Sequence, residues 1–182
     1  LTTAQLRTHE KLKCRDLALL TLLLGTGIRV SECVGLDIND VDFDNDRIKV
    51  VRKGGSESFV YFGDEVRAAL LDYMEERKQM NPDSGHENAL FISSKNKRLC
   101  VRSVELLVKK YSTVTTVKHI TPHKLRSTYG TNLYQASKDI YLVADVLGHK
   151  DVNTTRKHYA EIVDENKRSA RNIVRLRTEA DD

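Results

Sequence analysis

The stretch from Thr121 to Tyr159 limits the fold most tightly, because residues that start and stop helices stand at fixed points along it. Pro122 suits the first position of a helix, where its missing N–H costs nothing. Gly148 is typical of a residue that ends a helix in the left-handed conformation. Before Gly148, apolar residues recur at helical spacing at Ile140, Val143, Ala144 and Leu147. The stretch therefore predicts a helix that begins at Pro122 and a later one that stops at Gly148.

The same stretch contains polar residues whose side chains could take part in catalysis. His123 and Arg126 are three residues apart, so they point from one face of a helix. His149 follows Gly148 directly, and Tyr159 comes ten residues later. An imidazole donates to phosphate oxygens or carries protons near neutral pH, and a guanidinium presents a rigid fork to two oxygens. A tyrosine hydroxyl has a pKa of about 10, so it acts as a nucleophile only near positive charge or a base. The alternative is that Tyr159 is an ordinary core residue, which is what we expect of Tyr129, Tyr134 and Tyr141.

An apolar helix opens the chain. Glu10–Leu24 is apolar on nearly every side, which predicts a buried helix that ends at Gly25-Thr26-Gly27. Arg29 and Glu32 follow one helical turn apart. One reading is that they form a surface ion pair. The other is that the preceding break fixes the backbone of Arg29, and that Glu32 orients Arg29 or His123.

A strand-rich segment comes next, and helical spacing returns after it. Strands are predicted at Val41–Phe43, Arg47–Val51 and Glu57–Phe62. The turn Arg52–Gly55 places Lys53 at a hairpin tip, where a lysine is usually a solvated edge charge. Helices are predicted over 64–79, with Asp64 as N-cap, and over 103–111. These patterns favour a mainly helical α+β fold.

Length and composition exclude several classes of protein. The 182 residues suit one domain, and a formal net charge of +4 permits nucleic-acid binding without requiring it. No apolar run is long enough to span a bilayer. The cysteines at 14, 33 and 100 are scattered, which favours a reduced cytosolic protein. No metal-ligand spacing or glycine-rich phosphate loop occurs, so we expect neither a metal nor a cofactor.

Four phrases resemble the catalytic domain of the tyrosine recombinase, or phage-type integrase, family. They are Thr26-Gly27-Ile28-Arg29-Val30-Ser31-Glu32, His123-x-x-Arg126, Leu147-Gly148-His149 and Tyr159. The resemblance covers about Leu12–Glu161 and is closest to the Xer and conjugative-transposon integrase style. One departure is the spacing from His149 to Tyr159, which is one residue longer than is common in the family.

The resemblance implies a fold and a domain plan. The fold is a helical catalytic core with a small three-stranded antiparallel sheet, as in DNA breaking-rejoining enzymes. The chain is expected to be a single catalytic domain, with a core over 1–160 and a C-terminal docking tail over 161–182. The family's N-terminal core-binding domain is expected to be absent.

The resemblance also implies a set of catalytic residues, namely Arg29, Lys53, His123, Arg126, His149 and Tyr159. Tyr159 attacks the scissile phosphate and forms a 3′-phosphotyrosyl link. Arg29 and Arg126 stabilise the charge of the transition state, and His149 donates to the same oxygens.

Two further roles follow from the resemblance. Lys53 protonates the departing 5′-oxygen, with Arg52 as a competitor, and His123 assists proton transfer to or from the tyrosine. The reaction needs neither a metal nor ATP, because the phosphotyrosyl bond keeps the energy of the phosphodiester.

The implied function is site-specific DNA recombination in integration, excision or resolution. The expected partners are double-stranded DNA with specific recombination sites and further copies of the chain, as a homotetramer on paired sites. The expected location is the bacterial cytoplasm at the nucleoid, without a membrane. Arg102–Lys110 is a candidate for base reading. Two alternatives remain, a type IB topoisomerase and a non-catalytic DNA-binding module.

Overall fold

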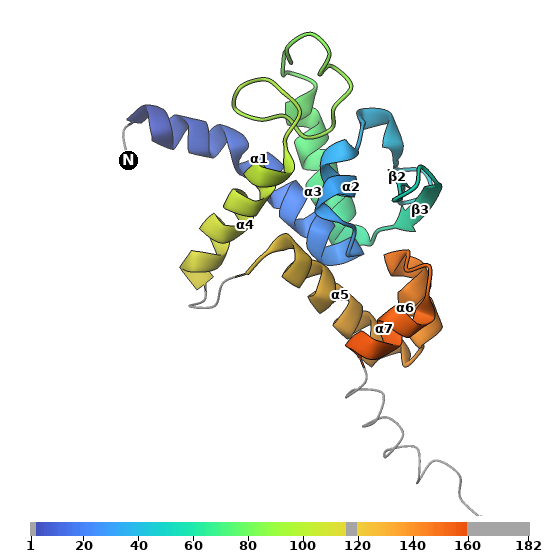
Figure 1. The fold of residues 1–182 in the computed structure, drawn as a ribbon. Helices are drawn as coiled ribbons and strands as arrows, with labels where there is room; N and C mark the ends of the chain where they lie inside the picture. The colour runs from blue at the N-terminus through green and yellow to red at the C-terminus, as the bar shows by residue number, and fades with distance from the viewer. Residues whose placement is uncertain (1–2, 116–119, 160–182) are drawn as a thin grey trace, which may run out of the picture. The chain divides into compact units, whose positions relative to one another are not determined.

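The computed structural model of the protein describes residues 3–115 and 120–159, which form helices and one small sheet (Figure 1). The described residues group into two compact units, one ending at Tyr129 and the other beginning at Gly130. The elements, in chain order, are α1 (Thr3–Thr26), α2 (Val30–Gly35), a 3-10 turn (Ile38–Asp40), β1 (Val41–Asp42), β2 (Arg47–Val51), β3 (Glu57–Tyr61), α3 (Asp64–Arg77), α4 (Val101–Thr115), α5 (Pro122–Ser137), α6 (Ile140–Leu147) and α7 (Val152–His158). This architecture confirms the predicted mainly helical α+β class.

The sheet is antiparallel with strand order β1-β2-β3, as predicted. Ile48 pairs with Val41 on one side and with Val60 on the other. Ile48 and Val60 are both buried, while their neighbours along the strands are more exposed. Because side chains alternate across a strand, one face of the sheet joins the core and the other carries polar and aromatic groups.

The core of the first unit lies mainly between α1 and α3, which pack against each other. Tyr73 on α3 stacks on Phe91 with ring centroids 5.4 Å apart. Its hydroxyl donates to the carbonyl of Leu90 and accepts from the N–H of Ile92. Burial raises the pKa of Tyr73 to about 12. This side chain therefore ties α3 to the buried connector Ala89–Ile92.

Two details of the helices differ from the prediction. Leu17 and Leu24 of α1 are exposed, because α3 covers only one side of α1 and these residues, seven positions apart, share another side. The N-cap of α3 is Gly63, and Asp64 is the first helical residue. Asp64 is therefore not a cap. Its negative charge lies in the first turn, where it interacts favourably with the positive end of the helix dipole.

In the second unit, α6 ends where the sequence predicts. Gly148 adopts φ of +64° and ends α6, as its position in the sequence indicates. Asp139 caps α6 and Asp151 caps α7 through their side chains. No helix in residues 3–115 and 120–159 is long and apolar enough to cross a membrane. The predicted docking tail at 161–182 lies outside the described residues.

Candidate active site

The break between α1 and α2 fixes the backbone at Arg29. Thr26 donates its hydroxyl to the carbonyl of Leu22 at 2.6 Å, and Gly27 then turns the chain with φ of +64°. Arg29 is the N-cap of α2, and its backbone N–H donates to Glu32 Oε2 at 2.8 Å. Because a left-handed residue followed by a capped helix leaves little freedom, the Arg29 backbone is held in one place.

Glu32 is a buried carboxylate that two guanidiniums share. Its side chain is 3 % exposed. Arg29 Nη1 donates to Oε1 at 3.0 Å, and Arg52 Nη1 lies 3.2 Å and 3.3 Å from the two carboxylate oxygens. The Arg29 side chain is 36 % exposed, whereas that of Arg52 is 8 % exposed. Glu32 is expected to orient Arg29 or His123. The structure pairs Glu32 with Arg29, and Arg52 is a second partner that the sequence does not indicate.

Lys53 lies at the β2–β3 turn, exposed and one residue beyond the buried Arg52. Gly54 and Gly55 follow it with φ of +96° and +83°. Only glycine adopts such angles readily, so these residues let the chain reverse directly after Lys53. The hairpin is closed by hydrogen bonds from the Arg52 N–H to the Ser56 carbonyl at 2.7 Å and from the Gly55 N–H to the Arg52 carbonyl at 3.0 Å.

Arg126 reaches the same break as Arg29, although 97 positions separate them in the sequence. It lies in the second turn of α5 and is 7 % exposed. Its Nη1 donates to the carbonyl of Gly27 at 2.6 Å. Gly27 is two residues before Arg29, so the break between α1 and α2 gathers two guanidiniums. We call Arg29, Arg52, Arg126 and Glu32 the arginine cluster.

His123, three residues before Arg126, lies at the surface. It lines a cavity of about 400 Å³ together with Val30 of α2 and Arg102 and Lys109 of α4. The basic helix that the sequence singled out therefore faces the same cavity as His123. Cationic side chains around one concave surface attract anions such as phosphate.

His149 and Tyr159 belong to the second unit. His149 directly follows the end of α6, and its Nδ1 lies 2.6 Å from the hydroxyl of the buried Thr155. Tyr159 ends α7, is 7 % exposed, and has its ring centroid 6.0 Å from that of Tyr134. A Cβ added at Gly130 would overlap the Tyr159 hydroxyl. The nucleophile candidate therefore packs against the backbone of α5.

Sequence reasoning missed Thr155 and Gly130. A signal existed for each. Thr155 stands one helical turn before Tyr159, and a glycine inside a helical pattern marks a close backbone approach.

Other tyrosines differ in their surroundings. Tyr134 is buried, as expected of a core residue, whereas Tyr141 is 68 % exposed, so its assignment to the core is wrong. Its backbone N–H donates to the Asp139 cap in the first turn of α6, and its side chain leaves the helix nearly opposite the buried Val143. Burial raises the pKa of Tyr129 and makes it harder to ionise.

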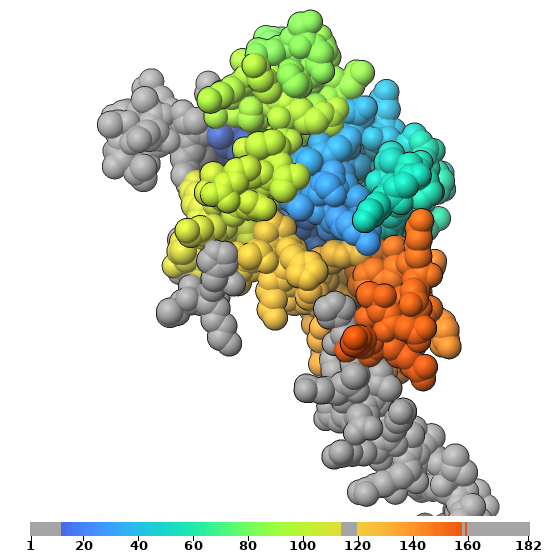
Figure 2. All heavy atoms as spheres, viewed as in Figure 1, coloured from blue at the N-terminus to red at the C-terminus, as the bar shows by residue number. Residues whose placement is uncertain are grey.

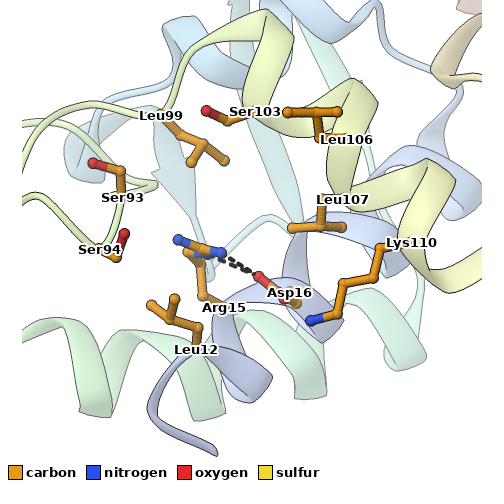
Figure 3. Close-up of a pocket in the computed structure, with 10 residues that line it drawn as sticks. All are labelled: Leu12, Arg15, Asp16, Ser93, Ser94, Leu99, Ser103, Leu106, Leu107 and Lys110. Carbon is orange, nitrogen blue, oxygen red and sulfur yellow. Dashed lines mark hydrogen bonds and ion pairs between the residues drawn. The ribbon is translucent and has the colours of Figure 1, made fainter. Parts of the chain in front are cut away.

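A second cavity, of about 360 Å³, contains none of the predicted catalytic residues (Figure 3). Two of its charged members, Arg15 and Asp16, pair with each other. Arg15 Nε donates to Asp16 Oδ1 at 2.9 Å, and Arg15 Nη1 donates to the Ile92 carbonyl at 3.0 Å. Tyr111 donates its hydroxyl to Asp16 Oδ2 at 3.1 Å. These contacts join α1 to α4 and to the connector that precedes α4. They stabilise the fold.

Groups of three or more histidine, cysteine, aspartate or glutamate side chains that could hold a metal ion do not occur within residues 3–115 and 120–159. The positive charge near the α1–α2 break comes from guanidiniums. An anionic ligand is the kind of group that such an arrangement binds.

Known proteins are similar to this chain in sequence and in fold. Tyrosine recombinase XerC of Corynebacterium glutamicum is 37 % identical over 149 residues, which cover 82 % of this chain and 47 % of that protein. The crystal structure of XerA recombinase superposes with a TM-score of 0.76 at 28 % identity, covering 98 % of this chain and 65 % of that one. The Tn1549 transposon integrase, solved with transposon right end DNA, gives a TM-score of 0.67 at 26 % identity, with 96 % and 66 % covered.

The chain spans about half the length of the curated relatives it matches. The model of the phage integrase family matches residues 2–166, a range that contains every residue of the predicted catalytic set. The chain therefore belongs to the phage integrase family.

Proposed function

We propose that this chain is the catalytic part of a tyrosine site-specific DNA recombinase. The observation that carries the proposal is the hydrogen bond from Arg126 to the carbonyl of Gly27, two residues before Arg29. It brings guanidiniums from distant parts of the sequence to one fixed break. Two guanidiniums are suited to hold the non-bridging oxygens of a phosphodiester, because each presents two parallel N–H donors.

The chemical step begins at Tyr159. Its hydroxyl oxygen attacks phosphorus and releases its proton, which His123 accepts or relays. The bond from phosphorus to the 5′-oxygen breaks, and Lys53 gives that oxygen a proton. The products are a 3′-phosphotyrosyl link and a free 5′-hydroxyl, and reversal of the step joins a new strand without ATP.

The remaining residues stabilise the charge that develops on the phosphate. Arg29 and Arg126 donate to its non-bridging oxygens, as preorganised donors do in other acyl- and phosphoryl-transfer sites. When the Thr155 hydroxyl donates to Nδ1 of His149, the ring proton resides on Nε2. His149 then donates to the phosphate through Nε2.

The proposed partners are double-stranded DNA with specific sites and three further copies of the chain, which form a tetramer on paired sites. DNA is supported by the Tn1549 transposon integrase, whose structure contains transposon right end DNA. The cavity beside His123 is lined by Arg102, which pairs with Glu105, and by Lys109, and these basic side chains give a surface suited to the phosphate backbone. The relative XerC of Corynebacterium glutamicum supports action on bacterial DNA, and the location that belongs to this proposal is the cytoplasm at the nucleoid.

A pool of nicked duplexes with randomised central sequence tests this function. The nick lies close to the cleaved phosphate, so that the short strand diffuses away and traps the covalent complex. The protein is incubated with the pool in excess EDTA, and adducts are separated on a denaturing gel and sequenced. We expect an adduct with the unaltered chain, enrichment of particular sequences, and none with Tyr159→Phe.

Three outcomes would count against the proposal. They are the absence of any adduct, a normal yield of adduct from Tyr159→Phe, and loss of activity in EDTA that magnesium restores. Relaxation of supercoiled DNA without recombination of paired sites would support a type IB topoisomerase instead.

A further inference from the structure

Arg52 is a buried guanidinium that the proposed chemistry does not use. It is the last residue before Lys53, and it follows the exposed Val51 at the end of β2. Figure 2 shows the hairpin at the surface beside α2, and β2 packs against α2. The Arg52 side chain lies within this contact and meets both oxygens of Glu32.

The Arg52–Glu32 pair joins two parts of the first unit, the start of α2 with Arg29 and the β2–β3 turn with Lys53. The Glu32 carboxylate accepts hydrogen bonds from the side chain of Arg29 and from the backbone N–H of Arg29. The same carboxylate holds Arg52, which is covalently next to Lys53. One buried group therefore fixes the positions of a phosphate-binding arginine and of the hairpin that presents the lysine.

The turn itself needs such an anchor. After Lys53 the chain runs through Gly54 and Gly55, both in left-handed conformations, and Ser56 is exposed. Glycine has the greatest backbone freedom, so the far side of the turn adds little stiffness. Lys53 is exposed as well. Arg52 is thus the side chain nearest to Lys53 that is fastened to the core.

We propose that Arg52 is a positioning residue, which aims Lys53 at the departing 5′-oxygen by fastening the β2–β3 hairpin to Glu32. This inference rests on the proposed function, because it assigns Arg52 to the protonation step of that reaction. A displacement of about 1 Å at a reacting group can cost about 100-fold in rate. Loss of the anchor therefore affects leaving-group departure and leaves phosphate binding by Arg29 in place.

The test compares two versions of one duplex selected from the randomised pool. In the second version sulfur replaces the 5′-bridging oxygen of the cleaved phosphate. A thiolate leaves without a proton because thiols are far more acidic than alcohols, so this substrate bypasses Lys53. Adduct formation is timed for the unaltered chain, Lys53→Ala, Arg52→Met, Arg52→Lys and Arg47→Met.

Lys53→Ala should be slower on the oxygen substrate by about 10²- to 10⁴-fold, the usual contribution of general acid catalysis, and near normal on the sulfur substrate. Arg52→Met should be slower on oxygen by about 10- to 100-fold and rescued by sulfur in the same way. Arg52→Lys keeps the charge and should lie between. Arg47 begins β2, the strand that leads to Arg52, and it pairs with Asp42, so Arg47→Met should keep the normal ratio of the two rates.

An Arg52→Met variant that is equally slow on both substrates overturns the proposal, since Arg52 would then act through charge or general stability. An Arg52→Met variant that is normal on both also overturns it. Failure of the unaltered chain on both substrates, or failure of sulfur to rescue Lys53→Ala, counts instead against the proposed function.

A second measurement needs no DNA and tests the anchor directly. Amide hydrogen exchange of residues 53–56 should be faster in Arg52→Met than in the unaltered chain, while exchange in α3 stays the same. Unchanged exchange in the turn overturns the proposal whatever the enzyme does.

Discussion

The arginine cluster of the first unit and Tyr159 of the second unit have different surroundings. The cluster is fixed by directional hydrogen bonds, from Arg126 to the Gly27 carbonyl and from Arg29 and Arg52 to the buried Glu32. In the second unit, Nδ1 of His149 lies 2.6 Å from the Thr155 hydroxyl, and Tyr159 has its ring beside Tyr134 and its hydroxyl against Gly130.

This difference has a physical consequence. Hydrogen bonds to charged groups have defined directions, so they hold donors ready for a phosphate before it binds. The Tyr159 ring meets another ring and the backbone at a glycine, so its position depends on the shape of the space around it. Substitutions of Arg29 and Arg126 should therefore act through charge, whereas those around Tyr159 should act through shape.

The largest effect is expected from Tyr159→Phe. This change deletes the proposed nucleophile and keeps the ring that packs beside Tyr134. Covalent adducts should vanish while thermal unfolding and DNA binding stay close to those of the unaltered chain. Retained adducts would direct attention to Tyr129, Tyr134 and Tyr141.

Arginine substitutions come next. Arg126→Ala and Arg29→Ala should each slow cleavage by about 10²- to 10³-fold, the usual cost of removing one preorganised donor. Arg126→Ala should also lower the free energy of unfolding by about 1–3 kcal/mol, because it leaves the Gly27 carbonyl without that donor. Arg29 is more exposed, so its loss should cost less stability. Single-turnover cleavage and urea unfolding of both variants measure the two effects. Normal cleavage by Arg126→Ala would remove Arg126 from the site.

Gly130→Ala tests the packing side of the comparison. An alanine inside a helix normally stabilises by about 1 kcal/mol relative to glycine. Here its Cβ would overlap the Tyr159 hydroxyl and approach Leu147 Cδ1 to 3.0 Å, so we expect a net loss of about 1–3 kcal/mol, as for other overpacked cores.

The matched control is Gly35→Ala, where a Cβ meets no atom within 4 Å. Tyr159→Phe should relieve part of the Gly130→Ala cost, with a coupling of at least about 0.5 kcal/mol in a double-mutant cycle. Additive effects would show that the hydroxyl does not rest on Gly130.

The smallest effect on catalysis is expected at Tyr73, which contributes to the pH dependence of stability. Tyr73 has a pKa of about 12 in the folded chain and about 10 when unfolded. Its contribution is complete below pH 10 and is lost as pH rises through 12. Between these values the unfolding free energy should fall by up to about 1.4 kcal/mol per pH unit more than in Tyr73→Phe. Equal slopes for the two proteins would contradict this assignment.

Local chemistry explains what the sequence predicts well. The helix start at Pro122, the stop at Gly148 and the strand Arg47–Val51 depend on residues within a few positions of each other. Their boundaries therefore follow from the sequence alone. Lys53 stands at the hairpin tip for the same reason.

Partners from distant parts of the chain could not be predicted in this way. Arg126 and Gly27 are 99 positions apart, and Arg52 and Glu32 are 20 apart. Which oxygen a long side chain meets depends on how the elements pack. The same limit explains Tyr141, because an aromatic residue at helical spacing does not reveal which side of its helix is covered.

The central claim is that Tyr159 forms a 3′-phosphotyrosyl bond to DNA. The most direct measurement is mass spectrometry of the trapped adduct after nuclease and protease digestion. The account predicts one modified peptide, with a nucleotide joined through its 3′-phosphate to Tyr159 and a free 5′-hydroxyl on the other strand end. A nucleotide on another residue, or one joined through its 5′-phosphate, would contradict it.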